Sequence, residues 1–268
     1  MLPTVVACDL AGTLLRSDGT LGQRTRRALA ACEAAGALVV LCTARPVRWV
    51  RPMAAQIGGR LVAVCANGGV MWDLGRDRLL LELLLESETA AAVVAALQAA
   101  FPGGAWAVER TDAFAHEPGY TPRWPVPDDT LVASVDELLA EPPVKLMFRH
   151  EGLSPDDMLG PARQAVGQLA ELTHSNSAEG LLEISATGVN KASTLARLCA
   201  SRGIGAEGVI AFGDMPNDLA MLEWAGRAIA VANAHPDVIA VADELTTSND
   251  ADGVARVLER IWGGRDPG

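Results

Sequence analysis

Short, uninterrupted apolar runs alternate with helix patterns at both ends of this 268-residue chain, and no other feature constrains the fold as strongly. The run TVVACDL at residues 4–10 precedes a helix pattern at 23–36, and the runs ALVVLCTA (37–44) and LVAVCANGG (61–69) follow. Continuous apolar strands are buried on both faces, which is typical of parallel sheets. Helices that alternate with such strands form right-handed βαβ crossovers. The sequence therefore predicts an α/β fold with a parallel sheet.

The middle of the chain has a different pattern, because its apolar runs are shorter and more often alternate with polar residues. The strand and helix alternation of the first part returns near residue 190. We therefore predict a discontinuous core domain at residues 1–70 and 186–268, with an inserted α+β domain at residues 71–185.

Turn and capping signals predict the elements of the inserted domain. A hairpin is expected around Gly75-Arg76, and Ser87 is expected to cap a helix that continues through Phe101. Ser154, with proline in the first turn after it, predicts a second helix that ends near Leu172. Residues 113–129 are rich in proline and aromatic residues and predict a connection dominated by loops.

Charge and cysteine content exclude several classes of function. The formal net charge is -11 and no block of Lys and Arg offsets it, which argues against a nucleic-acid or anionic-membrane partner. The 5 cysteines form no C-x-x-C pair, and several lie in apolar runs, so buried reduced thiols are expected rather than disulfides or zinc ligands. No basic segment precedes the first apolar run, and no apolar stretch reaches about 18 residues. We expect a soluble, cytoplasmic protein.

Polar residues cluster where buried strands end or where the following helices begin. These stretches are Asp9 with Gly12-Thr13, Thr43-Ala44-Arg45, Lys191, and Gly213-Asp214 with Asn217-Asp218. Ligands of an open parallel sheet bind beyond the carboxyl ends of its strands, at the point where strand order reverses. The stretches can therefore converge on one site.

Each of these residues also has a purely structural explanation. Asp9 could close a turn, Thr43 could end a strand, and Asp214 could cap a helix. Lys191 could be a solvated surface residue, although a cation at a helix start is disfavoured by the macrodipole. Asn67 could belong to an ordinary turn. Their joint placement at strand ends of one sheet favours a site.

Phosphoryl transfer is the chemistry that requires such a set. A phosphate needs its charge neutralised, and Mg²⁺ suits a few carboxylate or carbonyl oxygens. Asp9 and Asp214 can supply these ligands, with Asp218 nearby, and a carboxylate can also act as the nucleophile. The groups suited to hold phosphoryl oxygens are Thr43, Lys191 and the backbone N–H groups of Gly12-Thr13.

The sequence resembles the haloacid dehalogenase superfamily, and within it the Cof-like phosphatases that carry a type IIB cap. The matching stretches are DLAGTLL, LCTARP, CANGG, EISATGVNKASTLARLC, AFGDMPNDLAMLEWAG and ADGVARVLE. This resemblance implies a Rossmann-like core, an inserted cap domain, Mg²⁺, and hydrolysis of a small phosphorylated metabolite such as a sugar phosphate.

The resemblance also implies roles for individual residues. The catalytic positions are Asp9 as nucleophile, with Thr43 and Lys191 on the phosphoryl group. The metal positions are Asp9, the backbone carbonyl of Ala11, Asp214 and Asp218. The substrate-binding positions are Gly12, Thr13, Arg45, Asn67 and Gly68.

Ala11 departs from the family pattern, which has an aspartate two residues after the nucleophile. That aspartate protonates the leaving group and then deprotonates the attacking water, and a methyl group can do neither. General acid–base catalysis contributes about 10² to 10⁴ in rate. The metal site is less affected, because alanine retains the backbone carbonyl.

Four readings follow from Ala11. The chain is a phosphatase with weak activity or another proton donor; a non-catalytic protein that binds a phosphorylated metabolite; an Asp-to-Ala variant made to trap substrate; or a phosphonatase-like enzyme that cleaves carbon–phosphorus bonds. Phosphonatases of the superfamily carry alanine here but place a cap between their first two motifs. Residues 10–42, which separate Asp9 from Thr43, leave room for one helix but not for a cap. The phosphonatase-like function is therefore the least favoured of the four.

The sequence leaves the substrate and the oligomeric state, monomer or homodimer, open. In this family the cap reads the leaving group, and this part of the chain resembles the family least. Residues of its loop-rich part that could face a substrate are Arg110, His116, Tyr120, Arg123 and Trp124.

Overall fold

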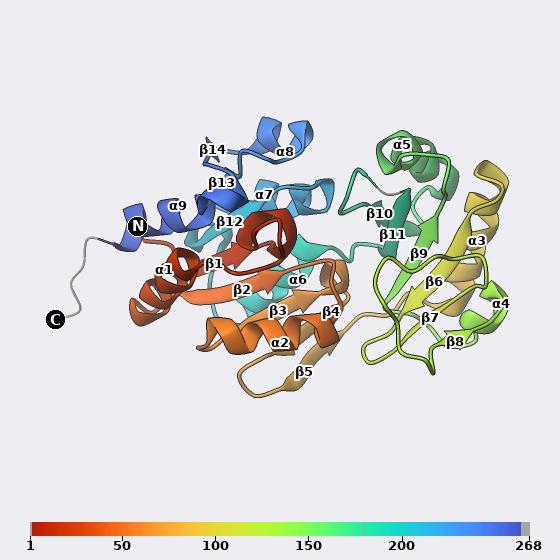
Figure 1. Ribbon diagram of the computed structural model, residues 1–268, viewed down its shortest axis with the longest axis horizontal. Coiled ribbons are helices and arrows are strands. Elements are labelled where there is room, and N and C mark those ends of the chain that lie inside the picture. The colour runs from red at the N-terminus through yellow and green to blue at the C-terminus, as the bar shows by residue number, and fades with distance from the viewer. Residues whose placement is uncertain (1, 179, 264–268) are drawn as a thin grey trace. The chain divides into compact units, whose positions relative to one another are not determined.

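A computed structural model describes residues 2–178 and 180–263 of the chain (Figure 1). The chain divides into two compact units, one of residues 1–80 with 191–268 and the other of residues 81–190. We expected the inserted domain at residues 71–185, whereas the second unit comprises residues 81–190. The first difference arises because the hairpin at Gly75-Arg76 completes the sheet of the first unit.

The first unit contains an eight-stranded sheet of order β14-β13-β12-β1-β2-β3-β4-β5. Its strands are β1 (Val5–Cys8), β2 (Leu38–Cys42), β3 (Val62–Cys65), β4 (Val70–Asp73), β5 (Arg78–Glu82), β12 (Val209–Gly213), β13 (Arg227–Ala230) and β14 (Glu244–Leu245). The pairs from β14 through β3 are parallel, and β4 runs antiparallel to β3.

Strand β1 lies at the centre of this sheet, where the strand order reverses. Cys8 is opposite Leu41 of β2 on one side and Phe212 of β12 on the other. All four residues of β1 are fully buried, as its continuous apolar sequence predicts. The residues after β1 and β12 are therefore placed at the switch point, where ligands of such sheets bind.

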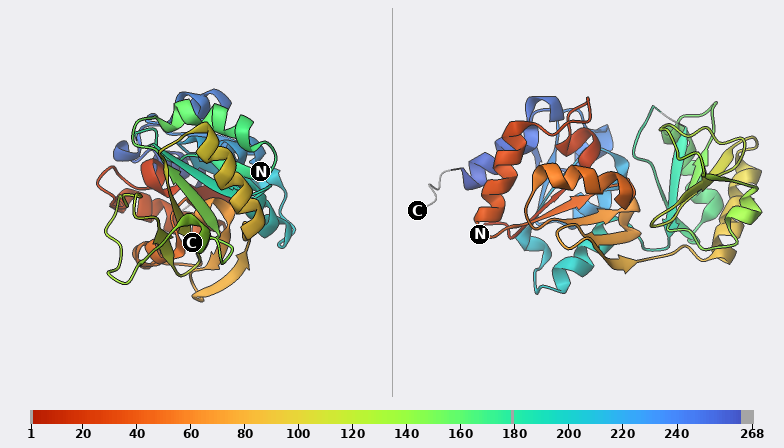
Figure 2. Two further views of the ribbon diagram at one scale, coloured as in Figure 1. Left: turned by 90° about the vertical axis from the view of Figure 1, so that its right-hand side faces the viewer. Right: turned by 60° about the horizontal axis from the view of Figure 1, so that its bottom comes forward.

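Helices cover both faces of the core sheet (Figures 1 and 2). On one face α1 (Gln23–Ala34) packs against α2 (Val47–Ile57) and α9 (Gly253–Trp262). On the other face α7 (Leu219–Trp224) packs against α6 (Lys191–Ala200) and α8 (Pro236–Val241). The change of face follows from right-handed crossovers that run in opposite directions from β1.

The second unit contains a mixed six-stranded sheet of order β10-β11-β9-β6-β7-β8. Its elements are α3 (Ser87–Ala100), β6 (Ala105–Glu109), β7 (Phe114–His116), β8 (Leu131–Val132), α4 (Val135–Leu138), β9 (Lys145–Arg149), α5 (Pro155–Val166), β10 (Ala170–Thr173) and β11 (Leu181–Ala186). Helix α3 packs against α5, and the buried rings of Trp106 and Phe148 lie 4.7 Å apart in the core of this unit.

Two local predictions in this unit were wrong. Glu86 is the N-cap of α3 and makes no side-chain capping bond, so Ser87 lies inside the helix. Helix α5 ends at Val166 rather than near Leu172, because Gly167 adopts a φ of 61° and the chain turns back as β10. The Ser154 cap is confirmed, since its hydroxyl accepts the Asp157 N–H at 3.1 Å.

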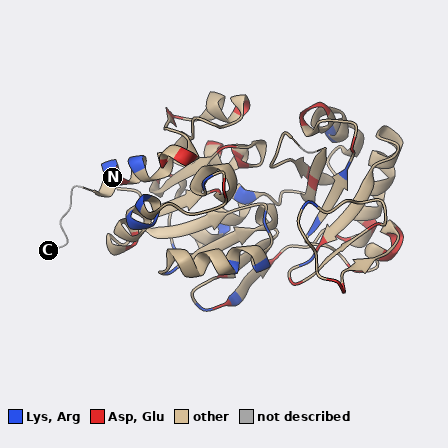
Figure 3. Cartoon of the chain, viewed as in Figure 1, with Lys and Arg blue, Asp and Glu red and all other residues tan. Residues whose placement is uncertain are grey.

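The structure also bears on the expectations from composition. Each of the 5 cysteines is free and buried. Within residues 2–178 and 180–263, no helix has the length and apolar character needed to cross a membrane. Acidic and basic residues are interspersed along both units (Figure 3).

Candidate active site

Asp9 follows β1 directly and is 5% exposed. Its N–H donates to the Phe212 carbonyl at 3.0 Å, which continues the pairing of β1 with β12 by one residue. The carboxylate is thus held at the carboxyl edge of the sheet by the pairing of β1 with β12. This placement suits a group that must keep its position while a ligand reacts or binds.

Asp214 follows β12, and the loop after β1 closes onto its carboxylate. The Thr13 hydroxyl donates to Asp214 Oδ1 at 2.6 Å. Gly12 has a φ of 80°, and a Cβ at this position would collide with the Asp214 side chain. Gly12 therefore allows both a left-handed turn and the close approach of the two loops.

Lys191 joins two of the aspartates and is fully buried at the start of α6. Its Nζ donates to Asp9 Oδ1 at 2.6 Å and to Asp218 Oδ1 at 2.7 Å. Asp218 Oδ2 accepts the backbone N–H groups of Asp214 and Met215, each at 3.1 Å. Asp218 thus orients both Lys191 and the loop that carries Asp214.

The cluster carries more negative than positive charge. Asp9, Asp214 and Asp218 each offer an oxygen within 4.8 Å of the others, and the Lys191 ammonium contacts Asp9 and Asp218. Burial raises the pKa of Asp9 to about 6 against the opposing charge of Lys191. Burial and then the charges of its two neighbours raise the pKa of Asp214 well above its usual range.

Lys191 remains charged in this environment. Burial by itself would lower the pKa of its ammonium group, but the Asp218 and Asp9 carboxylates outweigh this effect and raise the pKa above its ordinary value. Even so, one ammonium cannot neutralise three carboxylates. Hard cations such as Mg²⁺ are bound by carboxylate oxygens, so the chemistry of these donors fits a divalent metal.

Thr43 and Arg45 follow β2, beside Asp9's strand. Thr43 is 1% exposed, and its hydroxyl accepts the Arg45 N–H at 3.1 Å. The Arg45 guanidinium lies against the sulfur of Met53 in α2, with Nη1 and Sδ 3.4 Å apart. The threonine thus lies at the carboxyl edge of the sheet, while the arginine side chain contacts α2.

The segment after β3 has an unusual backbone. Ala66, Asn67 and Gly68 have φ values of 49°, 55° and 106°. Non-glycine residues in this region cost about 1–2 kcal/mol each, and such conformations concentrate at functional sites. The N–H groups of Ala66 and Asn67 donate to the carbonyls of Arg45 and Thr43 at 3.0 and 3.1 Å. These bonds tie the segment to the loop after β2.

Two residues to which the sequence assigned no role hold this segment. The Asn217 amide donates to Asn67 Oδ1 at 3.0 Å, and the Thr194 hydroxyl donates to the Gly68 carbonyl at 2.7 Å. Thr194 lies one helical turn after Lys191 on the same face of α6, which is the signal that could have identified it. In the sequence, Asn217 is distinguished only by its position next to Asp218.

The remaining predicted residues lie elsewhere. Ala11 has an exposed side chain, and its methyl group takes no part in the polar contacts of the cluster. The five inserted-domain candidates lie in the second unit. Arg110 donates to the Leu138 carbonyl at 2.8 Å, the rings of His116 and Tyr120 are 6.0 Å apart, and Arg123 lies over the ring of Trp124.

Comparison with known proteins gives consistent matches. A family of haloacid dehalogenase-like hydrolases matches residues 6–258. The 5-amino-6-(5-phospho-D-ribitylamino)uracil phosphatase YcsE of Bacillus subtilis is 28% identical over 264 residues, covering 96% of this chain and 95% of that protein. The pyridoxal phosphate phosphatase YbhA of Escherichia coli is 28% identical over 272 residues, covering 96% and 98%.

The fold is matched by solved structures as well. The sugar phosphatase BT4131, of subclass IIB of its superfamily, aligns with a TM-score of 0.78 and 18% identity over 96% of this chain and 98% of that chain. At this identity the likeness shows the fold alone. It confirms the predicted α/β architecture, with a parallel core sheet and a second, mixed sheet that forms a cap.

Proposed function

The chain belongs to the haloacid dehalogenase-like hydrolase family, and we propose that it hydrolyses a small phosphorylated metabolite through an aspartyl-phosphate on Asp9. Family membership confirms the resemblance drawn from the sequence. The likeness to characterised phosphatases over nearly the whole chain makes it a phosphomonoester hydrolase by homology.

One observation carries the proposed mechanism: Lys191 joins Asp9 and Asp218 beside Asp214 at the switch point of the sheet. Asp9 Oδ1 accepts from Lys191, so Oδ2 is the oxygen we assign to attack on phosphorus. The bond from phosphorus to the leaving oxygen then breaks, and water later hydrolyses the acyl phosphate on Asp9.

Asp9 and Asp214 would hold the Mg²⁺ ion, with Asp218 supporting them. When bound, the ion supplies charge neutralisation for the carboxylates and for the phosphoryl oxygens. Lys191 keeps Asp9 ionised and offers its positive charge to the phosphoryl group. Thr43 and the backbone of Gly12-Thr13 would donate hydrogen bonds to the same oxygens.

Ala11 limits this chemistry, because the resemblance places the general acid and base at its position. Leaving groups whose conjugate acids are strong need little protonation, so we expect phosphate esters of acidic alcohols or phenols to react fastest. Hydrolysis of the aspartyl-phosphate is also slowed by the missing base. Because Ala11 cannot act as acid or base, it also favours a second candidate function, in which the protein binds a phosphorylated metabolite without turnover.

Hydrolysis of p-nitrophenyl phosphate with and without Mg²⁺ tests the proposal, with Asp9→Asn as the control. A metal-dependent rate that Asp9→Asn abolishes is expected. No metal-dependent rate in the wild type would remove the phosphatase and favour the binding protein. A thermal-shift panel of sugar phosphates then tests the binding function.

Ala11→Asp is the sharper experiment. If only the acid and base are missing, restoring a carboxylate raises the rate by about 10² or more. An unchanged rate would mean that the site is built for another reaction. The substrate class, a small phosphorylated metabolite, is supported by relatives that act on a phosphoribityl compound and on pyridoxal phosphate.

A further inference from the structure

The loop of residues 10–15 after β1 has an irregular backbone with few internal hydrogen bonds. Its internal backbone bonds are Leu14 N–H to the Asp9 carbonyl at 3.2 Å and Leu15 N–H to the Leu10 carbonyl at 2.8 Å. Between them the helical turn is broken at Ala11 and Gly12, whose backbone angles are not helical. A loop of this kind needs outside contacts to keep one conformation.

Two asparagines from the C-terminal part of the chain supply those contacts. Asn233 Nδ2 donates to the Gly12 carbonyl at 2.8 Å, and Asn249 Nδ2 donates to the Leu15 carbonyl at 2.9 Å. The Asn249 backbone N–H donates to Asn233 Oδ1 at 3.0 Å, which joins the Asn233 side chain to the backbone of Asn249. The loop is therefore held at both ends by residues 221 and 234 positions away.

The segment that carries Asn233 also contacts the other side of the aspartate cluster. The His235 N–H donates to the Asp214 carbonyl at 2.8 Å. On the loop side, Gly12 lies against the Asp214 carboxylate, and Thr13 donates to it. Residues 233–235 thus donate to the carbonyl of Gly12, which precedes Thr13, and to the carbonyl of Asp214, whose carboxylate accepts from Thr13.

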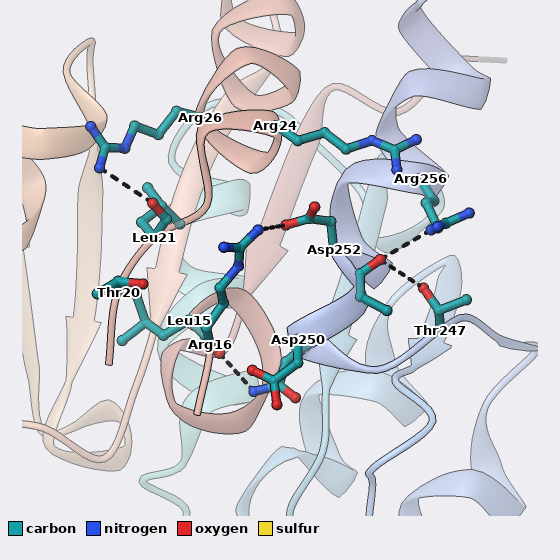
Figure 4. Close-up of polar contacts among 12 residues, drawn as sticks. Leu15, Arg16, Thr20, Leu21, Arg24, Arg26, Thr247, Asp250, Asp252 and Arg256 are labelled. Carbon is teal, nitrogen blue, oxygen red and sulfur yellow. Dashed lines mark hydrogen bonds and ion pairs between the residues drawn. The ribbon is translucent and has the colours of Figure 1, made fainter. Parts of the chain in front are cut away.

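A second, outer set of contacts joins the same two parts of the chain (Figure 4). Arg16 forms an ion pair with Asp252 at 2.9 Å, and Asp250 accepts both the N–H and the hydroxyl of Ser17 at 2.9 and 2.8 Å. The Ser17–Asp250 contacts are exposed, as Asn233 is, but they hold Ser17, which lies outside the loop of residues 10–15. The outer contacts therefore provide matched controls for the inner ones.

We infer that Asn233 and Asn249 are positioning residues: they act through the loop of residues 10–15 to set the geometry between Asp9, Thr13 and Asp214. The inference deepens the proposed function and rests on it. It assigns a role to the ADGVARVLE end of the chain, whose preceding Asn249 had no place in the predicted site.

The test uses Asn233→Asp and Asn249→Asp in the full-length protein. Each change keeps the shape but replaces the donating amide by a carboxylate that faces a carbonyl oxygen. The measurements are Mn²⁺ affinity by electron paramagnetic resonance, amide hydrogen exchange of residues 10–17, and kcat and KM for p-nitrophenyl phosphate. Asp250→Ala, which removes the exposed contacts to Ser17, is the control.

We expect each asparagine variant to weaken Mn²⁺ binding by about fivefold to tenfold, the loss of roughly one hydrogen bond. Exchange in residues 10–17 should become faster, and kcat should fall more than KM rises. The added carboxylate would by itself attract Mn²⁺, so weaker binding cannot come from its charge. Asp250→Ala should change Mn²⁺ affinity by less than about twofold.

A folded Asn233→Asp variant with unchanged Mn²⁺ affinity overturns the inference, even if exchange becomes faster, because the role would then be structural only. Asn233 is exposed, so this variant carries the test if Asn249→Asp fails to fold. Because both side chains hold the same loop, and the Asn249 backbone N–H also donates to Asn233, the effects of the two changes should be less than additive in the double variant. Fully additive effects would also overturn the inference.

These outcomes separate the inference from the proposed function. A wild type that binds Mn²⁺ but does not hydrolyse p-nitrophenyl phosphate removes the proposed turnover, while the Mn²⁺ and exchange measurements still decide the role of the asparagines. A wild type that binds no Mn²⁺ overturns both.

Discussion

The two units each contain a buried lysine paired with a carboxylate, but the charges around the two lysines differ. In the second unit Lys145 Nζ lies 2.6 Å from Glu183 Oε1, and the side chains are 5% and 3% exposed. In the first unit Lys191 contacts Asp9 and Asp218, with Asp214 beside them. The Lys145–Glu183 contact joins one ammonium and one carboxylate, whereas Lys191 contacts two carboxylates with a third beside them.

Removing charges from water costs several kcal/mol per ion, and a well-formed pair recovers much of it. The Lys145–Glu183 pair can therefore be explained by folding alone. The excess charge of the aspartate cluster has no such explanation, because burial opposes ionisation of Asp9 and Asp214. Perturbed groups of this kind are typical of sites that bind a ligand of opposite charge.

The largest expected difference between the two clusters is in activity. Asp9→Asn should lower the rate of p-nitrophenyl phosphate hydrolysis by more than about a thousandfold, because it removes the nucleophile. Glu183→Gln should leave the rate within about threefold. Initial rates at saturating Mg²⁺ measure both. Comparable losses in the two variants would contradict the assignment of Asp9.

Replacing each lysine in turn shows how much each cluster contributes to the free energy of unfolding. Lys191→Met and Lys145→Met should each lower the free energy of unfolding by about 3–5 kcal/mol, since each leaves a buried carboxylate without its ammonium. Mg²⁺ should restore part of the loss only in Lys191→Met, where the cation replaces the missing charge. Urea unfolding with Mg²⁺ and with EDTA measures this, and equal Mg²⁺ effects in both variants would refute the distinction.

Metal binding should stabilise the wild type directly. At a Mg²⁺ concentration of 100 times Kd the free energy of unfolding rises by about 2.7 kcal/mol. Glu183→Gln should retain this response, and Asp214→Asn should lose most of it, because it removes a metal ligand. Thermal melts with Mg²⁺ and after EDTA treatment measure the response. A full response in Asp214→Asn would place the metal elsewhere.

The smallest effect concerns pH in the absence of metal. The fold raises the pKa of Asp9 from 3.8 to about 6, so folding favours its protonated form. This contribution is fully present below pH 3.8 and is lost as the pH rises through about 6. Between pH 4 and 7.5 the wild type should lose about 1–3 kcal/mol relative to Asp9→Asn.

Unfolding of the wild type and Asp9→Asn in EDTA, compared at each pH, measures this difference. The comparison cancels the opposite trend of surface carboxylates such as Glu244, whose pKa is lowered in the folded protein by hydrogen bonds from Arg227 and Arg260 that outweigh its partial burial. A pH-independent difference would show that Asp9 is ionised throughout.

Most elements of the core were predictable because the longer strands of the parallel sheet are apolar runs and the helices repeat on one buried face, whereas the two-residue β14, Glu244–Leu245, carries no such signal. The inserted unit was harder. The sequence pattern predicts a helix that continues to about Leu172, because ELT at residues 171–173 carries no strand signal of its own. It becomes a strand by pairing with β11, which brings Leu172 opposite Ile184. Tertiary pairing of this kind overrides local propensity.

The site was predictable where polar residues end buried strands, as with Asp9, Thr43 and Asp214. It was not predictable where a side chain donates to a backbone carbonyl of another segment, as Asn233 and Asn249 do. Such bonds depend on the path of the main chain, which leaves no mark on the sequence of either partner.

The sequence by itself determined the alternation of strands and helices in the core, the positions of the carboxylates, and the alanine at position 11. These follow from side-chain chemistry and from periodicity along the chain. Only the tertiary structure decided that Asp9 and Asp218 share one ammonium group beside Asp214. Electrostatic energy depends on distance and burial, and folding brings residues from both ends of the chain within hydrogen-bond distance.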